Sequence, residues 1–319
     1  VGRSGREVVW TSGGTEADNL AILGVAARAE RRRLVVSAVE HKAVLAPAAA
    51  LAAAGWTVDW LPVAGDGVAI ATPIPPDTAL VSLMAANNET GAVQPIAAYA
   101  EAAHAAGALF HVDAAQAGYL DLAGVDADLI TLSAHKIGGP IGVGALIVKA
   151  GTRLAAVLHG GGHERGLRPG TVNVPGVAAF AAAAAELLAT RAVEAARLAA
   201  LRDRLADRIL AEVPQARRIG RPEASAPQIL CLVFPGVEGE ALVTQLDLAG
   251  LAASSGAACT TLGQEPSHVL PALGLDAAAV AGSLRLSLGW STTAAEIDEA
   301  AKTVVLTARM LLEQRPMRL

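Results

Sequence analysis

Short apolar runs alternate with longer, helix-patterned stretches through the first half of the chain. The runs are rich in Val, Leu and Ile and stop at Gly or polar residues, which is typical of buried strands. They occupy residues 7–11, 34–39, 57–61, 79–86, 108–113, 128–133 and 143–149. Helical patterns cover residues 15–30, 42–54 and 95–107. This alternation predicts an α/β fold built on a mostly parallel, doubly wound seven-stranded sheet.

One connection in this series is too short for a parallel crossover. Only a Gly-rich loop joins the run at 128–133 to the run at 143–149. Parallel neighbours need a connection of a dozen or more residues, usually a helix. One of these two strands is therefore predicted to run antiparallel to its neighbours.

The pattern changes from Pro175 onward, where a long helical run rich in Ala, Leu, Arg and Glu reaches about residue 213. Beyond this run, two strand patterns alternate with two helical patterns, at 228–234, 238–249, 283–288 and 293–313. This texture is typical of an α+β unit. We therefore predict a large domain over residues 1–174 and a smaller α+β C-terminal domain over residues 175–319.

Composition removes several classes of protein. The net charge of −5 provides no basic stripe for nucleic acid. Two cysteines cannot form a disulfide framework, and no Cys/His cluster has the spacing of a metal site. The apolar stretches are interrupted by charges rather than forming spans of about 20 residues. We expect no nucleic acid, no metal and no membrane span, and a reducing, cytoplasmic location.

A lysine follows the strand predicted at 128–133. The sequence there places Ser133, His135 and Lys136 just before a Gly-rich loop, and the chain holds only four lysines against 21 arginines. A desolvated lysine can lose its proton and attack a carbonyl group, whereas arginine stays protonated. Taken alone, Lys136 could equally be an ordinary surface lysine after a strand.

Other strand ends also carry polar residues. Gly14 and Thr15 follow the first strand in an SGGT turn, which suits an anion at a helix N-terminus, although a turn with an N-cap explains it as well. His41, Asn88, Asp113 and Gln116 follow three further strands. The carboxyl ends of parallel strands meet at one edge of a sheet, where ligands of open α/β folds bind. A lysine, an anion site and an acid at one edge are what pyridoxal 5'-phosphate requires.

These motifs form a series that extends nearly from end to end. They read TSGGTEADNLAI, EHKAVL, NNETGAVQPI, HVDAAQ, SAHKIGGPIGVGAL, GGGHERGLRPGT and SSGAACT, followed by EPSHVL and SLRLSLG. The chain resembles the NifS/IscS-type cysteine desulfurases, in the class V aminotransferase family of fold-type I pyridoxal-phosphate enzymes. Members begin with a further N-terminal segment that this sequence does not show, so we expect a truncated chain.

The resemblance implies roles for the strand-end residues. Lys136 corresponds to the lysine that binds the cofactor aldehyde, and His41 to the histidine that stacks on the ring and shuttles protons. Asp113 corresponds to the partner of the ring nitrogen. The resemblance further implies that Asn88 and Gln116 approach the ring hydroxyl and that a phosphate site is formed by Gly14, Thr15, Ser133 and His135 with Thr171 of a second subunit. A homodimer is therefore expected.

The resemblance also implies a nucleophile and a substrate anchor. Cys259, among small residues, corresponds to the thiol that takes the substrate sulfur as a persulfide. Arg285 corresponds to the fork that binds the substrate α-carboxylate, together with Asn88. Cys231, inside an apolar strand, has no predicted role.

The implied activity is conversion of L-cysteine to L-alanine and an enzyme-bound persulfide. The persulfide sulfur would pass to an acceptor such as an iron–sulfur scaffold protein, or enter thiolation. Two alternatives stay open: another class V enzyme, such as a selenocysteine lyase or aminotransferase, and a catalytically impaired scaffold that binds a sulfur-transfer partner.

Overall fold

The computed structural model describes residues 2–255 and 267–313, which fall into two compact units. The first unit comprises Val1–Pro62, Ala69–Asn87 and Gln94–Arg191. The second comprises Val63–Val68, Asn88–Val93 and Ala192–Leu319. The division falls inside a helix, between Arg191 and Ala192, whereas the sequence pattern places the domain boundary at the start of that helix. The division into a large domain over residues 1–174 and a smaller domain over residues 175–319 stays a prediction.

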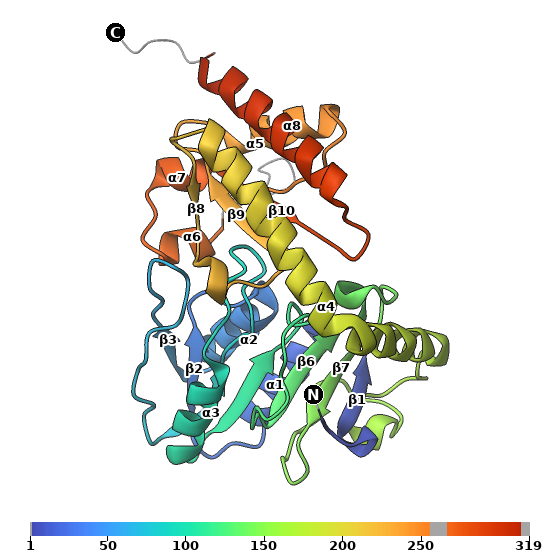
Figure 1. Ribbon diagram of the computed structural model, residues 1–319. Coiled ribbons are helices and arrows are strands. Elements are labelled where there is room, and N and C mark those ends of the chain that lie inside the picture. The colour runs from blue at the N-terminus through green and yellow to red at the C-terminus, as the bar shows by residue number, and fades with distance from the viewer. Residues whose placement is uncertain (1, 256–266, 314–319) are drawn as a thin grey trace. The chain divides into compact units, whose positions relative to one another are not determined.

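A seven-stranded sheet forms the centre of the first unit (Figure 1). Its strands are β1 (Val8–Thr11), β2 (Arg33–Ser37), β3 (Thr57–Leu61), β4 (Thr78–Ser82), β5 (Leu109–Asp113), β6 (Leu129–Ser133) and β7 (Gly144–Val148). The spatial order is β1-β7-β6-β5-β4-β2-β3. Strand β7 runs antiparallel to both of its neighbours, and the other pairs are parallel. The predicted fold class and the antiparallel connection are confirmed.

Helices cover both faces of this sheet (Figure 1). Helices α1 (Gly14–Ala26) and α2 (Lys42–Ala53) lie on one face, and α3 (Ile96–Ala105) lies on the other. Alanines and glycines bring α1 close to its neighbours: a Cβ added at Gly24 would lie 2.8 Å from the carbonyl oxygen of Ala155. Close backbone approach at such small residues therefore adds to the packing of the buried Leu, Ile and Val side chains of the core.

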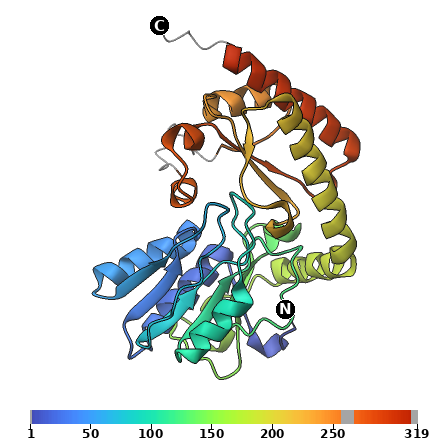
Figure 2. The same cartoon turned by 60° about the vertical axis from the view of Figure 1, so that its left-hand side comes forward.

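The second unit is an α+β unit, as predicted. Its three-stranded antiparallel sheet has the order β10-β9-β8. Its elements are β8 (Arg217–Arg218), β9 (Ile229–Val233), α5 (Gly239–Leu248), α6 (Val269–Ala272), α7 (Ala277–Ala281), β10 (Ser283–Ser287) and α8 (Ala294–Glu313). Helix α8 lies beside the second half of α4 (Val174–Glu212), where Arg204 and Arg208 both contact Asp298 (Figures 1 and 2).

Helix α4 is the one helix in the described part of the chain that is long and apolar enough to cross a bilayer by length and composition alone. The most apolar window of this helix is 11% buried. Length and apolar composition are weak evidence for a membrane span, because core helices of soluble proteins also have them. Within the first unit, Phe180 of α4 is buried and packs edge-on against Trp10, with ring centroids 6.0 Å apart.

Candidate functional site

Polar side chains converge where the parallel strands of the first unit end. Asp113 is the last residue of β5 and Ser133 the last of β6, and Asp113 is paired with Thr131 in register. A short 3-10 helix, Ala134–Ile137, follows β6 directly and carries Lys136 on its exposed side. His41, which follows β2, is the N-cap of α2.

Asp113 is the buried acid of this edge, and only 5% of its surface is exposed. Burial raises the pKa of Asp113, and the backbone N–H of Ala115 and the neighbouring His41 and Lys136 only partly offset this rise. The Asp113 Oδ1 accepts a hydrogen bond of 2.9 Å from Ala115 N, so this residue also makes the turn contact of an ordinary capping aspartate. The structure thus places His41 and Lys136 within electrostatic range of Asp113.

The turn before α1 lies against the end of β6. A Cβ added at Gly14 would lie 3.5 Å from the Ser133 Cβ, so the backbone of the turn and the Ser133 side chain are direct neighbours. Ser133 Oγ lies 3.0 Å from His135 Nδ1. The first turn of a helix leaves N–H groups without intrahelical partners. Helix α1, Ser133 and His135 therefore form a donor-rich corner that suits an anion, and Thr15 is exposed at this helix start.

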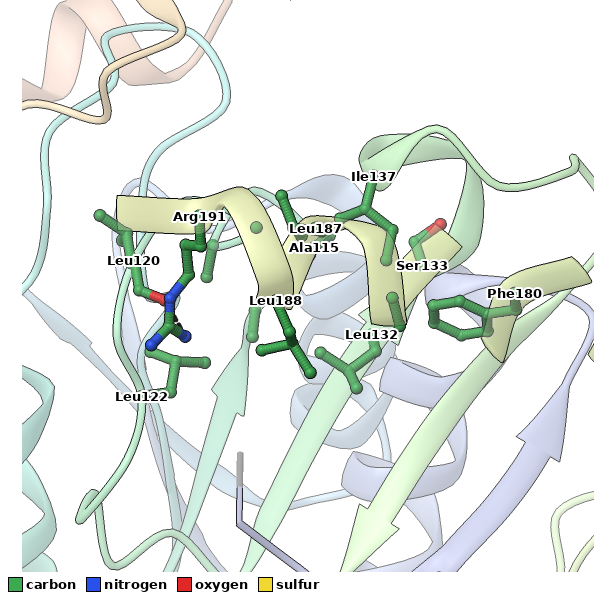
Figure 3. A pocket seen from close by; sticks show the side chains of 14 residues that line it. Ala115, Leu120, Leu122, Leu132, Ser133, Ile137, Phe180, Leu187, Leu188 and Arg191 are labelled. Carbon is green, nitrogen blue, oxygen red and sulfur yellow. Dashed lines mark hydrogen bonds between the residues drawn. The ribbon is translucent and has the colours of Figure 1, made fainter. Parts of the chain in front are cut away.

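An apolar pocket of about 210 Å³ begins at the same strand end (Figure 3). Ser133 and Ile137 lie at one end of it and Arg191 at the other, and Phe180 and Leu188 enter from α4. Arg191 is paired with Asp121 at 2.9 Å. The pocket therefore presents Ser133 as a polar group at the edge of a largely hydrocarbon surface.

Thr171 and Gln116 complete the predicted cofactor residues of this unit. Gln116 is half-buried in the loop after β5. Thr171 is exposed and lines a small pocket of about 70 Å³ with Ser12 and Arg168. Arg168 Nε donates a 2.9 Å hydrogen bond to Glu16 Oε1 on α1, which ties the segment carrying Thr171 to the start of that helix.

Two further predicted residues belong to the second unit. Arg285 of β10 is half-buried between Leu284 and Leu286, which are buried, and its Nη1 donates a 3.0 Å hydrogen bond to the Asn88 carbonyl oxygen. Cys259 lies outside the described residues. Cys231, which has no predicted role, is 3% exposed, and burial raises the pKa of its thiol to about 12.

A buried polar cluster that the sequence pattern did not predict surrounds His111. His111 of β5 has no exposed surface; its Nδ1 lies 2.9 Å from Ser82 Oγ, and its Nε2 lies 3.0 Å from Thr131 Oγ1 and 3.5 Å from Asp18 Oδ1. Burial lowers the pKa of His111 to about 3, so the imidazole is neutral at physiological pH. A histidine within the apolar run LFHVD was the signal that could have revealed this cluster.

Asp18 and Glu40 are the carboxyl groups of the same region. Asp18 is 2% exposed, and Glu40 has no exposed surface and accepts a 2.5 Å hydrogen bond from Met84 N. Burial raises the pKa values of the Asp18 and Glu40 carboxyl groups well above their ordinary values, and the negative charge of Asp113 raises both further. Burial thus favours the protonated acids at positions 18 and 40, whereas the Ala115 N–H, His41 and Lys136 favour the charged form of Asp113.

This charge distribution predicts how stability depends on pH. The pKa of Asp18 is higher in the folded protein than in the unfolded chain. The stability it contributes is therefore fully present below its unfolded pKa of about 4 and is lost as pH rises through its folded pKa. As pH rises above about 4, we expect the unfolding free energy of Asp18→Asn to fall less steeply than that of the wild type. The two slopes should differ by up to about 1.4 kcal/mol per pH unit.

Chemical denaturation at a series of pH values above 4 measures this difference. The exposed Asp207→Asn variant serves as the matched control and should follow the wild-type profile. Parallel profiles for wild type and Asp18→Asn would show that Asp18 is ionised in the folded protein.

Comparison with known proteins gives consistent matches. The family model described as aminotransferase class-V matches residues 2–300. A cysteine desulfurase of Cereibacter sphaeroides is 49% identical over 301 residues, which cover 92% of this chain and 77% of the relative. A solved NifS-like protein superposes with a TM-score of 0.89 at 32% identity, covering 97% of this chain and 84% of the other. The structure of SspA in complex with cysteine gives a TM-score of 0.75 at 30% identity, covering 90% and 82%.

Proposed function

The chain belongs to the class V aminotransferase family, and on this premise we propose that it is a pyridoxal-phosphate-dependent cysteine desulfurase. It converts L-cysteine to L-alanine and an enzyme-bound persulfide. The observation that carries the proposal is that His41 and Lys136 both lie within electrostatic range of Asp113 at one strand edge, next to a donor-rich helix start. The similar protein SspA has been solved with cysteine, which supports L-cysteine as the substrate.

The residues at the strand edge fit the cofactor. Pyridoxal phosphate, when bound, supplies an aldehyde that condenses with an amine and a protonated ring that withdraws electrons from the substrate. Lys136 Nζ would hold the aldehyde, and the Asp113 carboxylate would pair with the ring nitrogen. The phosphate would be held by Gly14, Thr15, Ser133 and His135, with Thr171 of a partner subunit. Gln116 and Asn88 would approach the ring hydroxyl.

His41 is oriented by its own backbone. Its Nδ1 accepts a hydrogen bond of 3.1 Å from Ala43 N, so the neutral ring carries its proton on Nε2. We assign His41 to stack on the ring and to present this N–H to the reacting groups. We assign Lys136 Nζ as the base that would remove the substrate α-proton.

Cys259 is the proposed sulfur acceptor. Its thiolate attacks the substrate sulfur, the bond between that sulfur and Cβ breaks, and the electron pair stays on carbon. One proton delivered to Cβ and one returned to Cα then complete alanine, while Cys259 keeps the sulfur as a persulfide. A sulfur-accepting protein, such as an iron–sulfur scaffold, is the proposed partner, and the cytoplasm is the proposed location because the chain's two cysteines suit a reducing compartment.

Product analysis tests the activity. The protein loaded with pyridoxal phosphate is incubated with L-cysteine and a reductant, and alanine and sulfide are measured while the visible absorption of the cofactor is recorded. Equal amounts of alanine and sulfide support the proposal. Turnover of selenocysteine alone would identify a selenocysteine lyase, transfer of the amino group to a keto acid would identify an aminotransferase, and a bound cofactor without turnover would identify an impaired scaffold.

A homodimer that shares Thr171 between sites predicts a complementation result. Thr171→Ala and Lys136→Ala subunits are each expected to form homodimers with reduced or absent activity. Mixed dimers of the two should regain one working site, because Lys136 of one subunit meets Thr171 of the other. The activity of purified mixed dimers checks this expectation, and no gain over the Thr171→Ala homodimer would assign Thr171 to its own subunit.

A further inference from the structure

Arg285 is held in place by two oxygen atoms of the second unit. Its Nη1 donates to the Asn88 carbonyl oxygen at 3.0 Å, and its Nη2 donates to Ser254 Oγ at 3.2 Å. The backbones of the same pair also form a bridge, because Arg285 N donates to Ser254 O at 2.7 Å and Ser254 N donates to Arg285 O at 3.2 Å. Ser254 is therefore joined to Arg285 by three hydrogen bonds.

The described side-chain hydrogen bonds of Arg285 both go to neutral oxygen atoms. Within residues 2–255 and 267–313 no carboxylate forms an ion pair with it. A guanidinium has five N–H donors, so three remain after these two bonds. A half-buried cation with a fixed plane and spare donors suits a carboxylate, which it can bind with two parallel hydrogen bonds.

We propose that Ser254 is a positioning residue whose hydroxyl fixes the Arg285 guanidinium for the substrate α-carboxylate and so makes the enzyme selective for the free amino acid. This inference rests on the proposed function, which assigns the carboxylate to Arg285. The other anchor, the Asn88 carbonyl, belongs to the main chain and survives any substitution. Ser254 Oγ is thus the side-chain anchor that mutation can remove while Arg285 itself is kept.

The test compares two substrates and three variants. Ser254→Ala removes the hydroxyl, and Ser254→Thr keeps it. Ser287→Ala is the matched control, at an exposed position of β10, the strand that carries Arg285. L-cysteine and L-cysteinamide differ in the carboxylate alone, so their KM and kcat values isolate its recognition. Loss of one hydrogen bond to a charged group is expected to raise the KM of Ser254→Ala for L-cysteine about tenfold. The kcat of Ser254→Ala and its KM for L-cysteinamide should change less than about twofold. The KM of Ser287→Ala for L-cysteine should likewise change less than about twofold.

The outcomes separate this inference from the function on which it rests. The positioning role is supported if Ser254→Ala loses its preference for L-cysteine over L-cysteinamide and Ser254→Thr retains that preference. Equal rises in KM for both substrates, or no change, would overturn it. Equilibrium binding of L-alanine and L-alaninamide, followed by the cofactor absorption, gives a second readout that needs no turnover. A wild-type protein that binds L-alanine yet releases none from L-cysteine contradicts the proposed function alone.

Discussion

Substitution of Lys136 by arginine is expected to lower alanine release from L-cysteine by at least about a thousandfold. Arginine preserves the positive charge that acts on Asp113, so the electrostatic balance at the strand edge is kept. It stays protonated, however, and can neither condense with the cofactor aldehyde nor accept the substrate α-proton. The effect therefore isolates the chemistry of the amine from its charge.

Two measurements check this expectation. Borohydride reduction followed by mass spectrometry should find the cofactor attached to Lys136 in the wild-type protein and no attachment in Lys136→Arg. The Lys302→Arg variant is the matched control, since Lys302 is an exposed lysine of α8 paired with Glu299. Attachment to another lysine, or wild-type turnover in Lys136→Arg, would refute the assignment.

Replacement of Cys259 by serine is expected to reduce turnover by about a hundredfold or more while the cofactor absorption is preserved. Serine matches cysteine closely in shape, but its hydroxyl does not ionise near neutral pH and cannot accept sulfur. Incubation of the wild-type protein with L-cysteine in the absence of reductant should add one sulfur atom to the peptide that contains Cys259. Mass spectrometry of the digested protein detects this addition.

Cys231 provides the control for the second thiol. Its side chain is buried and its thiol has a pKa of about 12, so almost none of it is thiolate at neutral pH. Cys231→Ala should therefore keep its activity per folded molecule and still form the persulfide at Cys259. Sulfur found on Cys231, or persistent turnover in Cys259→Ser, would rule out Cys259 as the acceptor.

The strand ends were predictable because they depend on local pattern. The run at 128–133 predicted β6 to within one residue, and the short Gly-rich connection predicted the antiparallel β7. Period and loop length are read directly from the order of residues, and parallel strands must place their carboxyl ends at one edge. The proximity of His41, Asp113 and Lys136 follows from that topology.

Contacts between distant segments were not predictable. Strand β8 contains two residues, Arg217 and Arg218, and forms only because β9 offers its edge. Ser254 and Arg285 are 31 residues apart, and no sequence pattern at either position predicts their contact. The missed cluster of Asp18, Glu40 and His111 combines residues of three separate segments, and each of them alone reads as a cap, a turn or an ordinary strand residue.

The α/β alternation, the seven strands of the sheet and the polar residues at the strand ends could be predicted from the order of residues, because hydrophobic period, glycine and proline act over a few neighbouring positions. The pKa shifts of these residues and the atoms that hold their side chains came from contacts between distant segments of the fold. Asp18 and Glu40 have raised pKa values because they are buried, and the Arg285 guanidinium is held because Ser254 Oγ lies within hydrogen-bond distance of it. Burial and pairing across the fold set these properties, and both depend on distances that the order of residues does not contain.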